Sequence, residues 1–226
     1  MKVKDFMVGA LSLACLAGCA GNNTQVVTAT NGSSLKAVSI FAPPEMNGNR
    51  YADTKLREVT PTASGVGMGL AVIGAVLGGG VSTGSFDKNS YKGSSIDTMP
   101  EPTASYLAPK AEAKIRDWLG KQTVSHQYEY PLNIAASGWS LVYSDMSSDN
   151  SNYDLRYHVQ FYKRPEGGNL FSAFVVADCS PAIKTAPIAE WRANNYLKVT
   201  QETQRMMDAC LLELNNQLPR LLKTGS

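Results

Sequence analysis

The chain has 226 residues, with 21 lysines and arginines against 19 aspartates and glutamates, and a formal net charge of +2. This near-balance argues against the strongly basic surface that nucleic-acid binding requires, so we expect no nucleic-acid partner. The length is sufficient for one domain with a sizeable core and an additional segment or tail.

The first 18 residues have the three parts of an export signal. Lys2 and Lys4 supply a positive start, and the stretch 6–17 is a run of apolar and small residues. That run is too short to cross a hydrocarbon core as a helix, which needs about 20 residues. Small residues then lead into Cys19. The stretch 1–18 is therefore expected to be removed as a signal peptide.

The motif Leu16-Ala17-Gly18-Cys19 resembles the lipobox of bacterial lipoprotein precursors. The resemblance implies cleavage after Gly18 and acylation of Cys19 by palmitate-type chains, which would anchor the protein in the membrane lipid. The resemblance also implies that Ala20 at the second mature position, rather than Asp, directs the protein to the outer membrane, with the domain facing the periplasm. Cys15 fits the motif less well, and the competing interpretation is an ordinary secretory signal with an incidental cysteine.

The segment that follows the expected cleavage site is rich in small and polar residues. Residues 19–34 are accordingly predicted to be a lipidated flexible tether. Residues 35–41 alternate well enough for a short strand, which Pro43 and Pro44 end. The whole stretch 35–103 is expected to be irregular apart from that strand, with polar residues at 45–64 and a linker at 82–103.

A glycine-rich apolar segment, 65–81, interrupts this region, and no charged residue occurs between Glu58 and Asp87. Its glycines include two pairs spaced four apart, which on a helix would allow close approach of another backbone: Gly65 and Gly69, and Gly74 and Gly78. The segment resembles the glycine zippers of some envelope proteins. Membrane contact or oligomer packing is the favoured interpretation, and a buried helix or a flexible insertion are the alternatives.

The remaining residues, 104–226, have the patterns of a compact α+β domain. An amphipathic helix is predicted near 107–120. Alternating residues then predict strands at 139–144 and 153–161, and a third strand from Leu170 to Cys179 that is apolar on both faces. The turn between the last two is Glu166-Gly167-Gly168-Asn169.

A long helix is predicted from about Pro187, with a buried stripe of widely spaced apolar residues: Met207, Leu211, Leu214, Leu218 and Leu221. Asn194-Asn195 weakens its beginning, and Pro219 should kink or end it near Gln217. Cys210 lies beside the stripe and Cys179 ends the third strand, so a helix that returns across the sheet would bring the two thiols together. A disulfide is expected there, with two buried free thiols as the alternative.

The fold class expected from these elements is α+β. A three-stranded antiparallel meander would be flanked by two helices and preceded by the tether and the glycine-rich segment.

No catalytic, metal or cofactor motif accompanies this fold. The two histidines, His126 and His158, lie in no cluster of metal-ligating spacing, and serine-nucleophile and phosphate-loop motifs are absent from the sequence. The polar face of the second predicted strand is expected to carry Arg156, His158, Gln160 and Lys163, either as a solvated face or as an interaction surface.

The expected function is therefore non-enzymatic. It is a structural or assembly-accessory role for a lipid-anchored envelope protein, with possible self-association or an envelope protein partner. The alternative is a small-ligand or lipid-binding accessory of an envelope transport system, which needs a roomy apolar pocket between sheet and helices.

Overall fold

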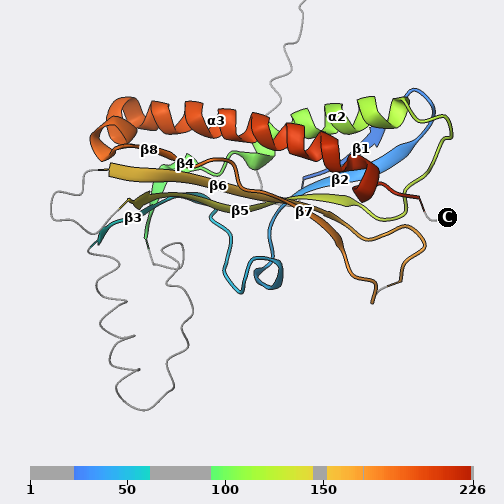
Figure 1. Cartoon of the computed structure of the whole chain (residues 1–226), viewed down its shortest axis with the longest axis horizontal. Coiled ribbons are helices and arrows are strands. Elements are labelled where there is room, and N and C mark those ends of the chain that lie inside the picture. Colours follow the sequence, from blue (N-terminus) through green and yellow to red (C-terminus); the bar gives the residue numbers. More distant parts are fainter. Residues whose placement is uncertain (1–22, 62–92, 145–151, 170, 225–226) are drawn as a thin grey trace, which may run out of the picture.

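The computed structural model describes residues 23–61, 93–144, 152–169 and 171–224. Eight strands of these described residues form one mixed sheet, and both long helices cover the same face of it (Figure 1). The expected signal peptide and Cys19 lie outside the described residues, as do the glycines of the segment 65–81.

A long antiparallel hairpin, β5 (Leu132–Tyr143) and β6 (Asn152–Lys163), forms the centre of the sheet. On the side away from β6, two shorter strands pair parallel with β5. These are β2 (Ser34–Phe41) along its first half and β3 (Lys55–Val59) along its second half. β1 (Asn23–Thr28) and β4 (Ser94–Pro100) extend the sheet antiparallel to β2 and β3. β7 (Val175–Cys179) and β8 (Lys184–Pro187) share the outer side of β6.

The prediction of a three-stranded meander was therefore wrong, because four further strands carry little sequence signal. β1 lies in the stretch expected to be a tether, and β3 and β4 lie in the stretch expected to be irregular. Most residues of β1 and β4 are exposed, so they lack the apolar alternation that marks a half-buried strand. β8 has only four residues and ends in Pro187.

The third predicted strand is also shorter than expected. It begins at Val175, and Phe171, which we placed in a buried strand, is 95% exposed. The turn after β6 explains the difference. Gly168 N–H donates to the carbonyl of Pro165, and Ser172 N–H donates to that of Asn169, so the chain is still turning at Ser172.

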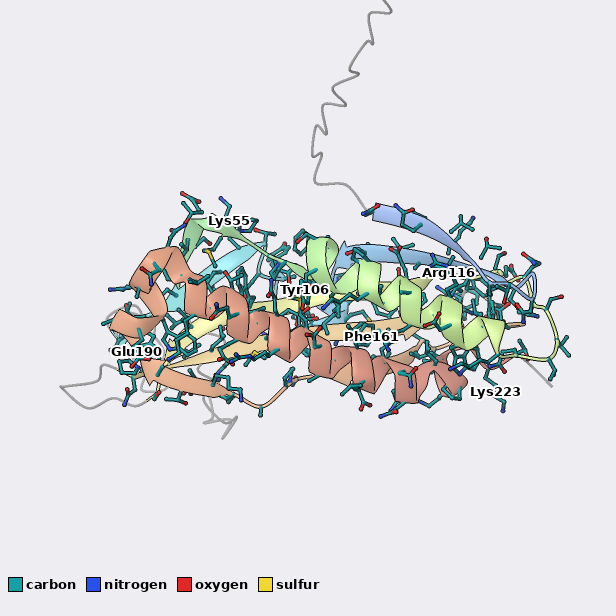
Figure 2. The ribbon with its side chains drawn as sticks, turned by 90° about the horizontal axis from the view of Figure 1, so that it is seen from above. Lys55, Tyr106, Arg116, Phe161, Glu190 and Lys223 are labelled. Carbon is teal, nitrogen blue, oxygen red and sulfur yellow. A yellow bond between two sulfur atoms is a disulfide. The ribbon has the colours of Figure 1, made fainter. Side chains whose placement is uncertain are left out.

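Both predicted helices are present and lie side by side over the sheet (Figure 2). α2 (Ala108–Gly120) follows a π-helical turn, Thr103–Leu107. α3 (Ile188–Leu221) buries the predicted stripe. Lys110 of α2 and Asp208 of α3 form an ion pair of 2.8 Å between the two helices.

The beginning of α3 is interrupted where the two asparagines predicted a weak point. Asn194, Asn195 and Tyr196 have positive φ angles of 50°, 53° and 61°. Pro219, by contrast, does not end the helix near Gln217, and α3 continues to Leu221. A proline so close to the C-terminus removes little backbone hydrogen bonding, while Leu218 and Leu221 are buried and hold the last turn on the core.

The core lies between the sheet and the helices and is filled by large side chains, among them Trp139, Trp191, Phe161 and Leu35. The predicted disulfide joins this layer to the sheet, because the Sγ atoms of Cys179 and Cys210 are 2.03 Å apart. The two cysteines belong to β7 and α3, the elements that the sequence had paired.

Candidate functional site

The face of the sheet opposite the helices has a gap between β2 and β3. Both strands pair with β5, but the chain leaves the sheet after Phe41 and returns at Lys55. The connection 42–54 passes below the sheet, on the side away from the helices (Figure 1). β5 itself has a register irregularity against β6 between Ala136 and Gly138, at the level of the gap. Bulges of this kind redirect side chains and end strand pairing.

Side chains of the connection replace the missing strand partner of β5. Asn47 Nδ2 donates to the carbonyl of Ser137 at 3.2 Å, and Asp53 Oδ2 accepts from the Trp139 backbone N–H at 2.9 Å. The connection is also fastened further along, where Gln160 Nε2 donates to the carbonyl of Met46 at 3.0 Å. These contacts satisfy buried backbone groups that a continuous strand would have paired, and they hold the connection in one position below the sheet.

A cleft of about 870 Å³ opens between this connection, the sheet and the turn after β7. Its floor consists of small residues of β5, namely Ser137, Gly138 and Ser140. A Cβ atom added to Gly138 would lie 3.8 Å from Asp53 Oδ2, within ordinary contact distance. Because these floor residues have short side chains or none, the space between the connection and the turn after β7 stays open.

Two arginines lie on one row across the cleft floor. Arg57 of β3 pairs with Ser140 of β5, and Ser140 pairs with Arg156 of β6. Because neighbouring strands are about 4.8 Å apart, the Cα atoms of the two arginines are about 10 Å apart on the same face. Arg50 of the connection and His158 of β6 also line the cleft. Arginines of the connection, of β3 and of β6 thus line one cleft, and Arg156 is about a hundred residues away from the other two in sequence.

The arginine side chains are held by carboxylates at the edge of the cleft. Arg57 Nε donates to Asp53 Oδ1 at 2.7 Å, and Arg156 Nη2 donates to Asp154 Oδ2 at 3.2 Å. The side chains of Arg57 and Arg156 are 19% and 25% exposed. His158 Nε2 lies 3.3 Å from Asp178 Oδ1. Such contacts orient the cations and lower the entropy lost when a ligand binds.

A buried acid lies near Asp53, beyond the edge of the cleft. Glu101 Oε1 accepts from Thr103 Oγ1, which in turn accepts from the Tyr157 hydroxyl, each at 2.6 Å. Burial raises the pKa of Glu101 from its ordinary 4.5 to about 7, against the opposing effect of the two hydrogen bonds from Thr103. The nearby charge of Asp53 also raises it.

A second, smaller cavity of about 370 Å³ lies where α2 and α3 end, and His126 and Tyr128 line it. Behind these residues Lys163 is fully buried and forms an ion pair with Glu166. Burial lowers the pKa of Lys163 despite that ion pair. Its position corrects the polar face that we assigned from the sequence. Lys163 has the same parity as Phe161 and lies on the helix-covered side, whereas Arg156, His158 and Gln160 lie on the open side.

The described residues contain no group of three metal-ligating side chains. Within the same residues, each histidine ring contacts a carboxylate, His126 with Glu166 at 3.4 Å and His158 with Asp178, and neither ring hydrogen-bonds a serine hydroxyl. No helix in the described part of the chain is long and apolar enough to cross a membrane.

The cleft could not be predicted from the sequence because three of its four charged lining residues come from the stretch 45–64, which we expected to be irregular. Arg50 and Asp53 have no periodic neighbours, and Arg57 lies in a strand of five residues. The only sequence signal for β3 was a short alternation, in which Leu56 and Glu58 face the helices and Arg57 faces the other side. That signal is too short to identify a strand.

Comparisons with protein-family models, with curated proteins and with solved structures found no match for this chain.

Proposed function

We propose that this protein is a lipid-anchored envelope protein with a non-enzymatic structural or assembly-accessory role. In this proposal Cys19 carries the acyl anchor in the outer membrane, and the domain faces the periplasm. The glycine-rich segment 65–81 then makes the second contact, with the membrane or with another copy of the chain. The lipobox and the composition of 65–81 support the proposal from the sequence.

The observation that carries it is the point at which the glycine-rich segment is inserted. β3 ends at Val59 and β4 begins at Ser94, and these strands pair antiparallel with Glu58 opposite Ser94. The chain therefore leaves and returns at neighbouring positions. An insertion with such closely spaced ends can be long without changing the sheet that holds it.

The base of this insertion is tightly built. A Cβ atom at Gly93 would lie 2.5 Å from the carbonyl oxygen of Glu58, a separation that side chains do not tolerate. The Glu58 side chain is buried and forms an ion pair with Arg192 at the beginning of α3. A rigid base of this kind suits a segment that makes contacts outside the domain.

The alternative role in apolar ligand or lipid binding requires a roomy pocket between the sheet and the helices. Trp139 and Trp191 are almost fully buried in that layer, and their indole N–H groups donate to Thr203 Oγ1 and to the carbonyl of Tyr153. This packing argues against an apolar pocket there.

The test replaces residues 65–81 of the full chain with a Gly-Ser sequence of the same length. Light scattering in detergent measures the oligomer mass. Vesicle flotation measures membrane affinity in a Cys19→Ala background, which removes the anchor. We expect the replacement to lower one of the two. Unchanged mass together with unchanged flotation would refute the packing role, and thermal unfolding of both proteins controls for a damaged fold.

The anchor has its own test. Labelling with radioactive palmitate in a bacterial host is expected to mark the unaltered chain and the Cys15→Ala variant, and not the Cys19→Ala variant. Label that persists without Cys19 would refute the assignment.

A further inference from the structure

We propose that the cleft below the sheet binds a small organic anion, with its phosphate or carboxylate oxygens between Arg57 and Arg156 and its apolar part against the rim. This site goes beyond the proposed structural role and does not depend on it.

The first argument is the charge of the lining. Three arginines, Arg50, Arg57 and Arg156, line the cleft together with one carboxylate, Asp53. Two further acids, Asp154 and Asp178, lie outside the lining but contact the lining residues Arg156 and His158, and each accepts hydrogen bonds from other donors as well. Asp154 accepts from the hydroxyls of Ser144 and Thr185, and Asp178 accepts from Gln160 Nε2. The residues that line the cavity carry three arginine charges against the one charge of Asp53, and this excess of positive charge favours an anionic ligand.

The second argument is geometric. Arginine guanidinium groups are planar forks that match the oxygens of carboxylate and phosphate. Arg57 and Arg156 flank the small side chain of Ser140 on one row of the sheet. An anion above Ser140 would lie between the Arg156 guanidinium and that of Arg57, whose Nε and Nη2 donate to the two oxygens of Asp53 at 2.7 and 3.3 Å. The third arginine, Arg50, approaches from the exposed connection.

The third argument is that the site is built before any ligand arrives. The cleft wall is held by the contacts of Asn47, Asp53 and Gln160, and both row arginines lie in strands that pair with β5. Sites on rigid strands with oriented side chains lose less entropy on binding than sites on unsupported loops.

The rim gives the ligand its second property. Tyr51 and Ile183 line the cleft and are 87% and 51% exposed, and Pro181 lines it as well. Exposed aromatic and aliphatic groups beside a charged floor suit a molecule that carries an apolar or aromatic part.

The full chain in neutral detergent is titrated calorimetrically with phenyl phosphate and with benzoate, and with phenol as the uncharged control. We expect at least one anion to bind with a dissociation constant below about 1 mM, and phenol not to bind. Arg156→Gln should weaken binding at least tenfold. Arg50→Gln, which changes an exposed side chain and should leave the fold intact, should weaken it several-fold.

The matched control is Arg205→Gln, which removes an arginine from the exposed side of α3 and should leave the affinity unchanged. Dihexanoyl phosphatidic acid, compared with dihexanoyl phosphatidylcholine, separates the two sources of such an anion. Tighter binding of the phosphatidic acid than of phenyl phosphate would identify a lipid headgroup, and the reverse would identify a free small molecule. Absence of binding by all three anions at 10 mM, or equal affinity of Arg50→Gln, Arg156→Gln and Arg205→Gln, would overturn the proposal.

Discussion

The Asp53 carboxylate accepts a hydrogen bond from the backbone N–H of Trp139 at 2.9 Å, at the point where β2 has ended and β3 has not begun. A side chain from the connection thereby completes the central strand. Trp139 is 2% exposed, so its N–H has little access to water. The same carboxylate orients Arg57, so one residue links the integrity of the sheet to the cleft.

Loss of this carboxylate should destabilise the protein. Asp53→Ala leaves the N–H of Trp139 without its acceptor, and we expect a loss of about 1–3 kcal/mol of unfolding free energy. Urea unfolding measures it. Asp97→Ala is the matched control, because Asp97 is 87% exposed in an ion pair with Lys55 and should matter by less than about 1 kcal/mol. Equal effects of the two changes would contradict the role assigned to Asp53.

The buried acid Glu101 should make stability depend on pH. Its pKa of about 7 in the folded protein exceeds its ordinary 4.5, so the folded state binds the proton more tightly than the unfolded state. The unfolding free energy should therefore fall as the pH rises from 4.5 to 7. Above pH 7 the contribution of Glu101 to it should stay constant.

Glu101→Gln removes this titration and supplies one amide oxygen in place of the two carboxylate oxygens that accept from Thr103, so one of these hydrogen bonds is lost at every pH. Relative to the unaltered protein, the variant should gain on the order of 3 kcal/mol between pH 4.5 and pH 8. Urea unfolding at several pH values gives both curves. Parallel curves would show that Glu101 does not titrate in this range.

The disulfide between Cys179 and Cys210 closes a loop with a sequence separation of 31. The double change Cys179→Ala and Cys210→Ala should lower the unfolding free energy by about 2–4 kcal/mol, because the cross-link restricts the unfolded chain. Thermal unfolding with and without a reductant measures this. Only the unaltered protein should respond to the reductant, and a reductant effect on the double variant would point to a different cause.

The left-handed turn in α3 predicts an unusual order of substitutions at Asn195. Glycine tolerates a positive φ and alanine does not, so Asn195→Gly should be more stable than Asn195→Ala by about 1 kcal/mol. The same pair at Gln201, an exposed position in the regular part of α3, should show the opposite order. If Asn195→Ala were the more stable variant, the helix would be continuous at this position.

The sequence alone identified the elements whose burial is periodic. The burial of β6 alternates from Asn152 to Val159, and α2 and α3 carry apolar stripes. All three were recognised because one face of each is buried against the core. The disulfide followed from the same patterns, because both β7 and α3 were predicted, Cys179 ends β7 and Cys210 lies in α3. The signal and Cys19 were interpreted from local motifs and remain predictions.

Tertiary structure alone decided the rest of the sheet and the cleft. β1 and β4 are mostly exposed edge strands, held by backbone hydrogen bonds to β2 and β3, and such pairing leaves no pattern in the side chains. Lys163 was misplaced for a related reason. Its position in β6, two residues after Phe161, puts it on the buried face, but its charge led us to assign it to the exposed face. Arg57 and Arg156 are separated by about a hundred residues in sequence and become neighbours only through the pairing of both strands with β5.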